Sequence, residues 1–320
     1  MNNSSGGLRV KNPGLFTLLQ DQGRFGQAQQ GLSQGGVCDE LAAGWANYLL
    51  QNISNAALLE ISFGQAEFEA TTTLQLALTG APMDAIIVKQ SGRIIKQANN
   101  QSFVLFKGDC LKLSFATSGV RAYLAIKGGF VSKAILASVS SVKRNGIGGL
   151  KQDGTALKVG DYLPATERQT EFIKRQIPKQ FIPDHNQPVT LSVIESYQHD
   201  RFSVNEKNRF YSSEYTVDKQ SDRMGMRLQG EAISGSVTGI ISEGIALGGI
   251  QIPADGNPII LLQDRQTLGG YPKIGCVSRC DLSQLAQQSV GKKVRFKRAE
   301  LQTEQLRYLQ RLRFFNTLAN

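Results

Sequence analysis

Two glycine-rich segments near the C-terminal end of the chain carry polar side chains that plain turns do not need. They span residues 248–258 and 263–273 and flank a short apolar strand. Four of their side chains have the chemistry for proton transfer or charge neutralisation: Asp264, Arg265, Tyr271 and Lys273. Asp264 could act as a base and Tyr271 as an acid, while the two cations could stabilise developing negative charge. The alternative is a hairpin with glycine turns and solvated charges.

The same segments offer groups that could contact a ligand without reacting with it. Loops held at fixed strand ends are where binding residues usually lie. We therefore predict ligand contacts at four positions of these segments: Gln251, Pro253, Gly269 and Gly270.

A tight turn early in the chain holds a carboxylate, a guanidinium and two glycines. Asp21 and Arg24 are the charged members, and Gly23 and Gly26 allow a close approach of the backbone to a ligand. Arg24 could bind a carboxylate or a phosphate through two parallel hydrogen bonds. We predict catalytic roles for Asp21 and Arg24 and ligand contacts at Gln20, Gly23 and Gly26. An internal Asp–Arg pair that braces the turn is the alternative.

Two arginines form a further candidate site. Arg223 and Arg227 lie on either side of Gly225 and could face a common anion, so we predict both as ligand contacts. They could equally brace a β-turn against the first domain.

The remaining composition excludes several kinds of chemistry. His185 and His199 are the only histidines, so proton transfer must fall on Asp, Glu, Lys, Tyr or water. No Gly-x4-Gly-Lys-Ser/Thr segment occurs, which excludes a nucleotide site of the Walker type. The cysteine spacing favours neither a metal site nor a disulfide framework, and we expect reduced, mostly buried thiols at four positions: Cys38, Cys110, Cys276 and Cys280.

The bulk numbers describe an ordinary globular protein. Its 320 residues are 41% hydrophobic and 19% charged, enough for one large domain or two medium ones. No apolar run reaches the length of about 18 residues that a membrane span needs. Residues 1–7 are polar and small, so we expect a flexible tail, no signal peptide and a cytoplasmic location. The net charge is +10, and much of the excess of Lys and Arg lies in the last thirty residues or so. Aromatic residues do not alternate with these charges, which favours a solvated basic face over a nucleic-acid site.

Short strands separated by turns that contain glycine predict a β-barrel or a β-sandwich. Residues 58–63 alternate between apolar and polar side chains, as a strand does. Residues 103–106 and 111–115 flank Gly108-Asp109, which predicts a hairpin. A further strand is expected at residues 121–126, and strands resume at residues 189–194.

Two helices are expected among these strands. Asp39 suits the N-cap of a helix that ends near Asn52, with one apolar face: Leu41, Trp45, Tyr48 and Leu49. The second is a C-terminal helix with apolar residues on one side: Leu306, Leu309, Leu312 and Phe315. A polar, proline-marked stretch before residue 190 suggests a linker. The predicted organisation is a first β-barrel domain, a linker, a second β-barrel domain and a helix: residues 1–165, 166–189, 190–299 and 300–320.

Several segments, in the correct order, resemble the biotin-dependent carboxyltransferase / allophanate hydrolase subunit 2 family. They cover much of residues 8–298: residues 14–26, 31–39, 46–49, 57–60, 223–230, 242–244, 249–253, 256–258 and 269–272. The resemblance implies two cyclophilin-like β-barrel domains in tandem, and it adds Asn47 to the predicted ligand contacts. Two departures from the family pattern occur. Residues 137–144 lack the usual Ser-Arg-Ser-Thr stretch, and Ser196-Tyr197 stands where Gly-Pro is expected.

The resemblance also implies a function and partners. Members include the C subunit of prokaryotic ATP-dependent 5-oxoprolinase, the carboxyltransferase part of urea carboxylase, and an antagonist of a sporulation-kinase inhibitor. The first of these is the favoured expectation: an ATP-dependent hydrolase of a cyclic amide that works with a small B-type subunit and a separate A subunit. ATP would then be a cofactor bound by this chain or by the complex.

Two other functions stay open. A carboxyltransferase would bind carboxybiotin carried by another protein, with Gln251 and Tyr271 near the biotin ring. The chain has no biotin-acceptor Met-Lys-Met segment, so it cannot carry biotin covalently. A regulator that sequesters the paired small subunit would show no turnover.

Overall fold

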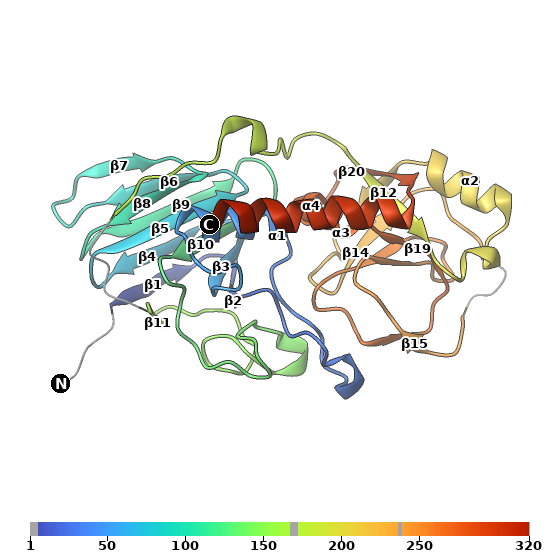
Figure 1. The fold of residues 1–320 in the computed structure, drawn as a ribbon, viewed down its shortest axis with the longest axis horizontal. Coiled ribbons are helices and arrows are strands. Elements are labelled where there is room, and N and C mark those ends of the chain that lie inside the picture. Colours follow the sequence, from blue (N-terminus) through green and yellow to red (C-terminus); the bar gives the residue numbers. More distant parts are fainter. Residues whose placement is uncertain (1–5, 167–171, 236–238, 320) are drawn as a thin grey trace. The chain divides into compact units, whose positions relative to one another are not determined.

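The computed structural model describes residues 6–166, 172–235 and 239–319. These residues form two compact units (Figure 1). The first contains the chain up to Arg24 and Gly35–Asp184, and the second contains Phe25–Gln34 and His185–Thr317. A loop from the first part of the sequence therefore belongs to the second unit. Parts of the predicted tail and linker, residues 1–5 and 167–171, lie outside the described residues.

The first unit is built from two antiparallel sheets. One has six strands in the order β11 (Tyr162–Pro164), β1 (Gly7–Pro13), β4 (Ala66–Ala70), β9 (Cys110–Ala116), β6 (Met83–Val88) and β7 (Ile94–Gln97). The other has five strands in the order β2 (Phe16–Gln20), β3 (Leu58–Ser62), β10 (Arg121–Ile126), β5 (Leu74–Gly80) and β8 (Gln101–Leu105). Their inner faces share one core, and five of its fully buried side chains are Leu59, Phe68, Leu76, Leu111 and Leu124.

The hairpin predicted around Gly108-Asp109 is wrong. β8 pairs with β5, whereas β9 pairs with β4 and β6, so the chain changes sheets at this turn. Asp109 stabilises the turn because its carboxylate accepts from the backbone N–H of Phe106 at 3.0 Å and from Lys89 Nζ at 2.6 Å. The local turn signal was real, but the pairing depended on the other strands.

Helix α1 (Glu40–Leu49) confirms the first predicted helix. Asp39 is its N-cap, and its carboxylate accepts from the backbone N–H of Ala42 at 3.0 Å. The helix packs on β5 and β10, where Thr79 donates to the Ala42 carbonyl at 2.7 Å. Beneath its N-terminus, buried Glu60 accepts from Tyr123 and from the N–H of Cys38, each at 2.8 Å, so this acid serves the fold.

The second unit is a closed barrel of seven strands. Their order is β12 (Val189–Glu195), β19 (Lys273–Val277), β16 (Gly249–Gln251), β17 (Ile259–Leu261), β14 (Gly225–Gln229), β13 (Tyr215–Val217) and β20 (Lys293–Arg298), which pairs in parallel with β12. A separate ribbon joins β15 (Glu243–Gly244) to β18 (Leu268–Gly269). The barrel core contains a stacked pair, Phe210 and Phe296, with ring centroids 4.4 Å apart.

Three helices accompany the barrel within the described residues: α2 (Val204–Ser212), α3 (Arg279–Leu285) and α4 (Leu301–Ala319). The described part of the chain also has four short 3-10 turns: Ala28–Gln30, Lys143–Asn145, Lys179–Phe181 and His199–Arg201. The predicted C-terminal helix is confirmed as α4, whereas α2 and α3 were not predicted. Among the described residues, no helix is both long and apolar enough to cross a membrane.

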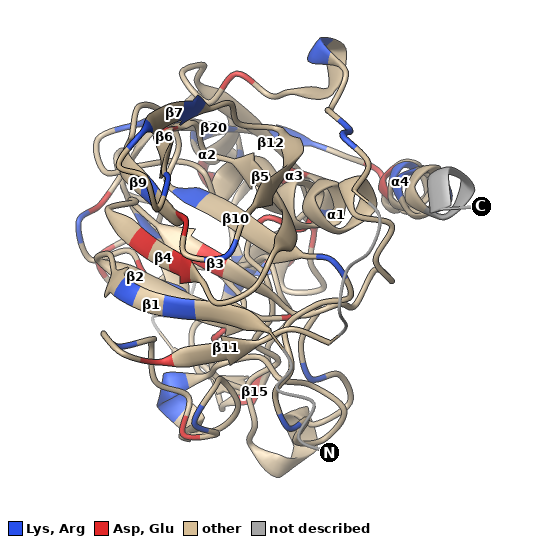
Figure 2. Ribbon diagram, turned by 90° about the vertical axis from the view of Figure 1, so that its left-hand side faces the viewer, with Lys and Arg blue, Asp and Glu red and all other residues tan. Residues whose placement is uncertain are grey.

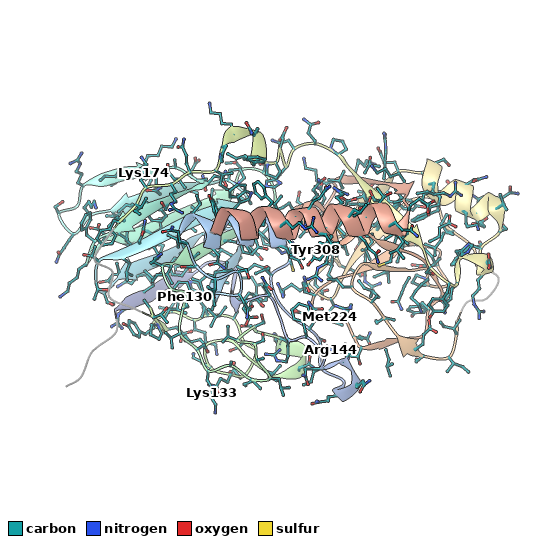
Figure 3. All side chains as sticks on the ribbon, in the orientation of Figure 1. Phe130, Lys133, Arg144, Lys174, Met224 and Tyr308 are labelled. Carbon is teal, nitrogen blue, oxygen red and sulfur yellow. The ribbon has the colours of Figure 1, made fainter. Side chains whose placement is uncertain are left out.

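Helix α4 lies on the second unit through polar contacts. Arg307 pairs with Asp281 at 2.7 Å, and Glu304 accepts from Ser278 at 2.5 Å. The ring of Tyr308, labelled in Figure 3, lies 4.8 Å from the Arg279 guanidinium. Three leucines of the predicted apolar side stay largely exposed: Leu306 at 61%, Leu309 at 48% and Leu312 at 42%.

Charged side chains on the six-stranded sheet alternate in sign. Figure 2 shows the acidic positions of β4, in red, between basic positions of β1 and β9, in blue. Glu69 pairs with Lys11 at 3.2 Å, and Glu67 pairs with Lys112 at 3.1 Å. Such exposed pairs contribute little to stability, typically about 0–1 kcal/mol. The mainly β fold predicted from the sequence is confirmed, with the closed barrel in the second unit and paired sheets in the first.

Candidate functional site

Asp21, a predicted catalytic residue, holds two loops of the first unit together. Its carboxylate accepts from the hydroxyls of Ser138 and Ser140, each at 2.6 Å. The backbone N–H groups of Val139 and Gly23 also donate to it, each at 2.8 Å. With four donors and 5% exposure, this carboxylate is fully engaged by its own chain.

Arg24 is buried beside this carboxylate but does not form with it the internal ion pair that was the alternative to a catalytic role. Its Nε donates to the Ile135 carbonyl at 2.9 Å, and its Nη2 donates to the carbonyls of Ser138 and Ser140 at 3.3 and 3.2 Å. The side chain is 1% exposed, and this burial lowers the pKa of Arg24, while the charge of Asp21 opposes the shift. The arginine therefore braces the turn through backbone carbonyls.

The remaining first-unit candidates are also engaged internally. Gln20 donates to the Ser141 carbonyl at 3.0 Å and accepts from the N–H of Gly36 at 3.1 Å. Asn47, in α1, donates to the Ala56 carbonyl at 3.0 Å. These contacts connect neighbouring segments of the first unit.

Gly23 and Gly26 both have positive φ, but the structural reason for a glycine differs between the two positions. Gly23 has a φ of 101° and donates its N–H to Asp21, so its backbone conformation serves that carboxylate. Gly26 has a φ of 75° with open space where a Cβ would lie. Gly26 is needed for its conformation and not for close packing.

In the second unit, a buried lysine meets a carboxylate from a separate ribbon. The Lys273 side chain, at the start of β19, is 7% exposed and pairs with Glu243 of β15. Tyr197 and Gln198 donate to the same carboxylate oxygen, Glu243 Oε1, and the distance from Gln198 is 2.7 Å. The Tyr197 ring centroid lies 6.0 Å from Lys273 Nζ, the outer limit of a cation–π contact.

Hydrogen bonding and desolvation shift the pKa values of two members of this group. The hydrogen bond from Lys273 and then that from Tyr197 lower the pKa of Glu243. Desolvation of the hydroxyl and its hydrogen bond to Glu243 raise the pKa of Tyr197 to about 12. Near neutral pH the carboxylate is therefore ionised and the phenol is protonated.

Gln251 of β16 completes this group. It lies directly opposite Lys273 in the barrel, so the two side chains share a face. Its Nε2 is buried and has no hydrogen-bond partner among the described residues. A Cβ placed on Gly269 would overlap this Nε2, which explains the glycine there. We call five residues the Lys273 cluster: Tyr197, Gln198, Glu243, Gln251 and Lys273.

Three other predicted residues of these segments lie within three positions of Gln251 or Lys273 in the sequence: Pro253, Gly270 and Tyr271. The Gly270 carbonyl accepts from the N–H of Ile240 at 2.8 Å, next to the β15–β18 ribbon. Pro253 accepts from the N–H of Gly256 at 3.0 Å and so closes the turn after β16. Tyr271 is 44% exposed.

Asp264 and Arg223 form a buried pair. Arg223 Nε and Nη2 each donate to one oxygen of Asp264 at 2.9 Å, and Arg223 is 6% exposed. Arg227, by contrast, is an exposed residue of β14. The structure therefore does not bring the two predicted arginines onto a common anion site, and Asp264 is held by a two-bond ion pair.

Arg265 is a largely buried cation. Its Nε and Nη1 make only long hydrogen bonds, each 3.4 Å, to the carbonyls of Ile245 and Leu262. Desolvation lowers its pKa, the charge of Arg279 lowers it further, and Cys276 opposes the shift. Burial in turn raises the pKa of the Cys276 thiol to about 11. All four cysteines are free thiols.

The loop Phe25–Gln34 is attached beside Arg265. Ser33, 2% exposed, donates to the carbonyl of Arg265 at 2.7 Å and to that of Asp264 at 3.3 Å. The ring of Phe25 lies 5.9 Å from the Arg279 guanidinium. Sequence reasoning did not place this loop in the second unit, because its contacts are more than two hundred positions away.

Sequence reasoning also missed three members of the Lys273 cluster: Tyr197, Gln198 and Glu243. Glu243 lies in a Ser-Glu-Gly segment that carried part of the family resemblance, which was the available signal. Within the described part of the chain, no three His, Cys, Asp or Glu side chains are grouped as metal ligands.

Comparison with known proteins identifies relatives. The family described as carboxyltransferase domain, subdomain A and B, matches residues 30–298. The C subunit of the 5-oxoprolinase of Escherichia coli (strain K12) is 34% identical over 98% of this chain and 97% of its own. That of Haemophilus influenzae is 31% identical over 89% and 88%. The solved structure of Kluyveromyces lactis urea carboxylase shares the fold, with a TM-score of 0.90 at 22% identity, and this chain covers 30% of it.

Proposed function

Because the chain belongs to the carboxyltransferase domain family of subdomains A and B, we propose that it is the C subunit of an ATP-dependent 5-oxoprolinase complex. The observation that carries the proposal is the end-to-end similarity to two bacterial proteins that are each named as the C subunit of 5-oxoprolinase. The complex would open the lactam of 5-oxoproline to glutamate. A small B-type subunit and a separate A subunit would be the other components of the complex.

The chemistry requires activation of an unreactive amide. Amide resonance makes hydrolysis of the lactam slow, and phosphorylation of the amide oxygen by ATP creates a good leaving group. Water then attacks the activated carbon and the C–N bond breaks, which leaves the acyl phosphate of glutamate. A second water hydrolyses this acyl phosphate to glutamate and phosphate. Such a site needs donors for anionic groups of the substrate and a carboxylate near the water.

The Lys273 cluster offers these groups. Lys273 and Gln251 are buried donors on one face of the barrel, and Glu243 is an ionised carboxylate in contact with the lysine. Arg265 supplies a second cation of the same unit, and Tyr271 is an accessible acid on the segment that leads into β19. We propose that Asp21, Arg24 and Asp264 hold loops, because their charged groups are bonded to their own chain.

The test is ATP-dependent release of glutamate from 5-oxoproline by this chain mixed with A and B partners from the same genome. We expect release only when all three are present. Lys273→Ala should lower turnover by about 100-fold, the usual effect of removing a donor that stabilises developing charge. Lys293→Ala, on an exposed strand position, is the matched control. Full turnover by Lys273→Ala would refute the assignment of the site.

A carboxyltransferase is the second candidate, because the family description and the urea carboxylase structure favour it. It predicts affinity for free biotin, with Gln251 and Tyr271 near the ring. Calorimetry with biotin separates the two functions. Biotin binding without glutamate release would favour carboxyl transfer, whereas glutamate release without biotin binding would favour the oxoprolinase.

A further inference from the structure

Three donors of the Lys273 cluster converge on a single oxygen. Lys273 Nζ, the Tyr197 hydroxyl and Gln198 Nε2 all donate to Glu243 Oε1. Lys273 and Gln198 are also fixed to one another, because the Lys273 N–H donates to Gln198 Oε1 at 2.9 Å. This is the arrangement of a binding site for a carboxylate, and in this structure a side chain of the protein itself occupies it.

A fourth donor of the same site has no acceptor within the part of the chain that the structure describes. Gln251 is 6% exposed, and its Nε2 has no partner among the described residues. The Nε2 lies on the side of β18 where a Gly269 side chain would project. Gly269 is directly opposite Glu243 in the ribbon, so that side also carries the Glu243 side chain. A buried donor without an acceptor has lost its hydrogen bonds to water, and a suitable ligand would replace them.

The donors and the carboxylate belong to parts of different rigidity. Lys273 and Gln251 lie on barrel strands, and Gln198 follows shortly after the end of β12. Glu243 lies on the β15–β18 ribbon, which has only two residue pairs, and its side chain is 32% exposed. The occupant can therefore leave while the donors stay in place.

We propose that Glu243 is an internal stand-in for the carboxylate of a small-molecule ligand. The ligand displaces Glu243, takes over the hydrogen bonds from Lys273, Tyr197 and Gln198, and adds the one from Gln251. The identity of the ligand as 5-oxoproline, which carries a free carboxylate, rests on the proposed function. The binding site for a carboxylate does not depend on it.

Competition by a tethered group makes a sharp prediction. A ligand can bind only while the internal carboxylate is out of the site. The apparent Kd therefore equals the intrinsic Kd divided by the fraction of molecules whose site is vacant. Glu243→Ala should therefore bind acetate and 5-oxoproline at least tenfold more tightly than the wild type. Glu243→Gln should be intermediate, because its amide oxygen still accepts hydrogen bonds but carries no charge.

Gln251 provides the complementary test. Its amide Nε2 makes no hydrogen bond within the described residues, so Gln251→Ala should leave the melting temperature nearly unchanged. It should weaken carboxylate binding by about tenfold, the value of one hydrogen bond to a charged group. Lys273→Met should abolish binding.

The experiment is calorimetric titration of the full chain and these variants with acetate, 5-oxoproline and the uncharged amide of 5-oxoproline, with thermal melting to verify folding. Binding of both acids but not of the amide, strengthened in Glu243→Ala, supports the proposal. Unchanged or weaker binding in Glu243→Ala and Glu243→Gln, or no binding of any acid at tens of millimolar, overturns it.

The two proposals fail separately. Glutamate release by the complete complex without tighter acid binding in Glu243→Ala would retain the oxoprolinase and reject the stand-in. Tighter acetate binding without glutamate release under any condition would retain the stand-in and reject the oxoprolinase.

Discussion

Arg24 and Lys273 are both buried cations, but their partners differ. Arg24 donates to three carbonyls of the loop that starts at Ile135, groups that cannot move without disturbing the backbone. Lys273 donates to a side chain on a short ribbon, which can be replaced. At the scale of residues, the mobility of the partner separates a structural cation from one that can meet a ligand.

Arg24→Met should destabilise the first unit by about 3 kcal/mol, because three buried carbonyls lose a charged donor. The measurement is hydrogen exchange of the first unit, together with the melting temperature. Arg9→Met, at an exposed position of β1, should change stability by less than about 0.5 kcal/mol. Equal effects of the two substitutions would contradict the bracing role.

Cys276 should resist alkylation at pH 8. Burial raises its pKa to about 11, so the folded protein holds the thiol in its protonated, unreactive form up to that range. We expect iodoacetamide to label it about 100-fold more slowly than an ordinary thiol of pKa about 8.5. Mass spectrometry of native and urea-unfolded protein measures the ratio. Since unfolding lowers this raised pKa, the contribution of the thiol to stability is complete below about pH 8.5 and is lost as the pH rises towards 11.

At the scale of elements, ion pairs and polar hydrogen bonds attach α4 to the second unit, whereas three of its leucines stay exposed. Arg307→Met should loosen it, because Asp281, whose side chain is 5% exposed, would lose its ion-pair partner. Because the Arg307 side chain is 41% exposed, the cost should be below the roughly 3 kcal/mol of a fully buried pair. Hydrogen exchange of residues 301–315 is the measurement, and Arg313→Met, at an exposed position, is the control. Protection that is unchanged in Arg307→Met would show that other contacts hold the helix.

Elements with strong local signals were predictable, and those set by distant partners were not. The Asp39 cap marked α1 correctly, and Ser203, whose hydroxyl accepts from the N–H of Glu206 at 3.2 Å, carried an equally readable signal for α2 that was missed. The turn at Asp109 was visible, but not that β8 and β9 join different sheets.

The candidate site shows the same division. Lys273, Gln251 and Gly269 were predicted because they share one stretch of sequence rich in glycine and polar residues. Glu243 and Gln198 were not, because only the barrel and its ribbon bring them to the lysine. The density of polar residues in the sequence pointed to two donors of the candidate site, Lys273 and Gln251, whereas their carboxylate neighbour Glu243 lies in a separate segment.

At the scale of the whole molecule, one residue from the first part of the chain should affect only the second unit. Ser33→Ala removes a buried donor to the carbonyls of Asp264 and Arg265, which should cost about 1–2 kcal/mol. Faster hydrogen exchange should appear at residues 262–266 while the first unit keeps its protection. Gln29→Ala, exposed on the same loop, is the control. Loss of protection in the first unit instead would reject the assignment of the loop to the second.

The division of the chain into two units also determines the order in which their parts can fold during synthesis. The loop Phe25–Gln34 leaves the ribosome long before His185, where the rest of its unit begins. At 5–20 residues per second, roughly 8 to 30 seconds separate the two, so the loop must wait for its own unit while the first unit can already fold. A nascent chain stalled near Asp184 should therefore carry an ordered first unit from which one loop is open to proteases, and that loop should become resistant only after the barrel has been made.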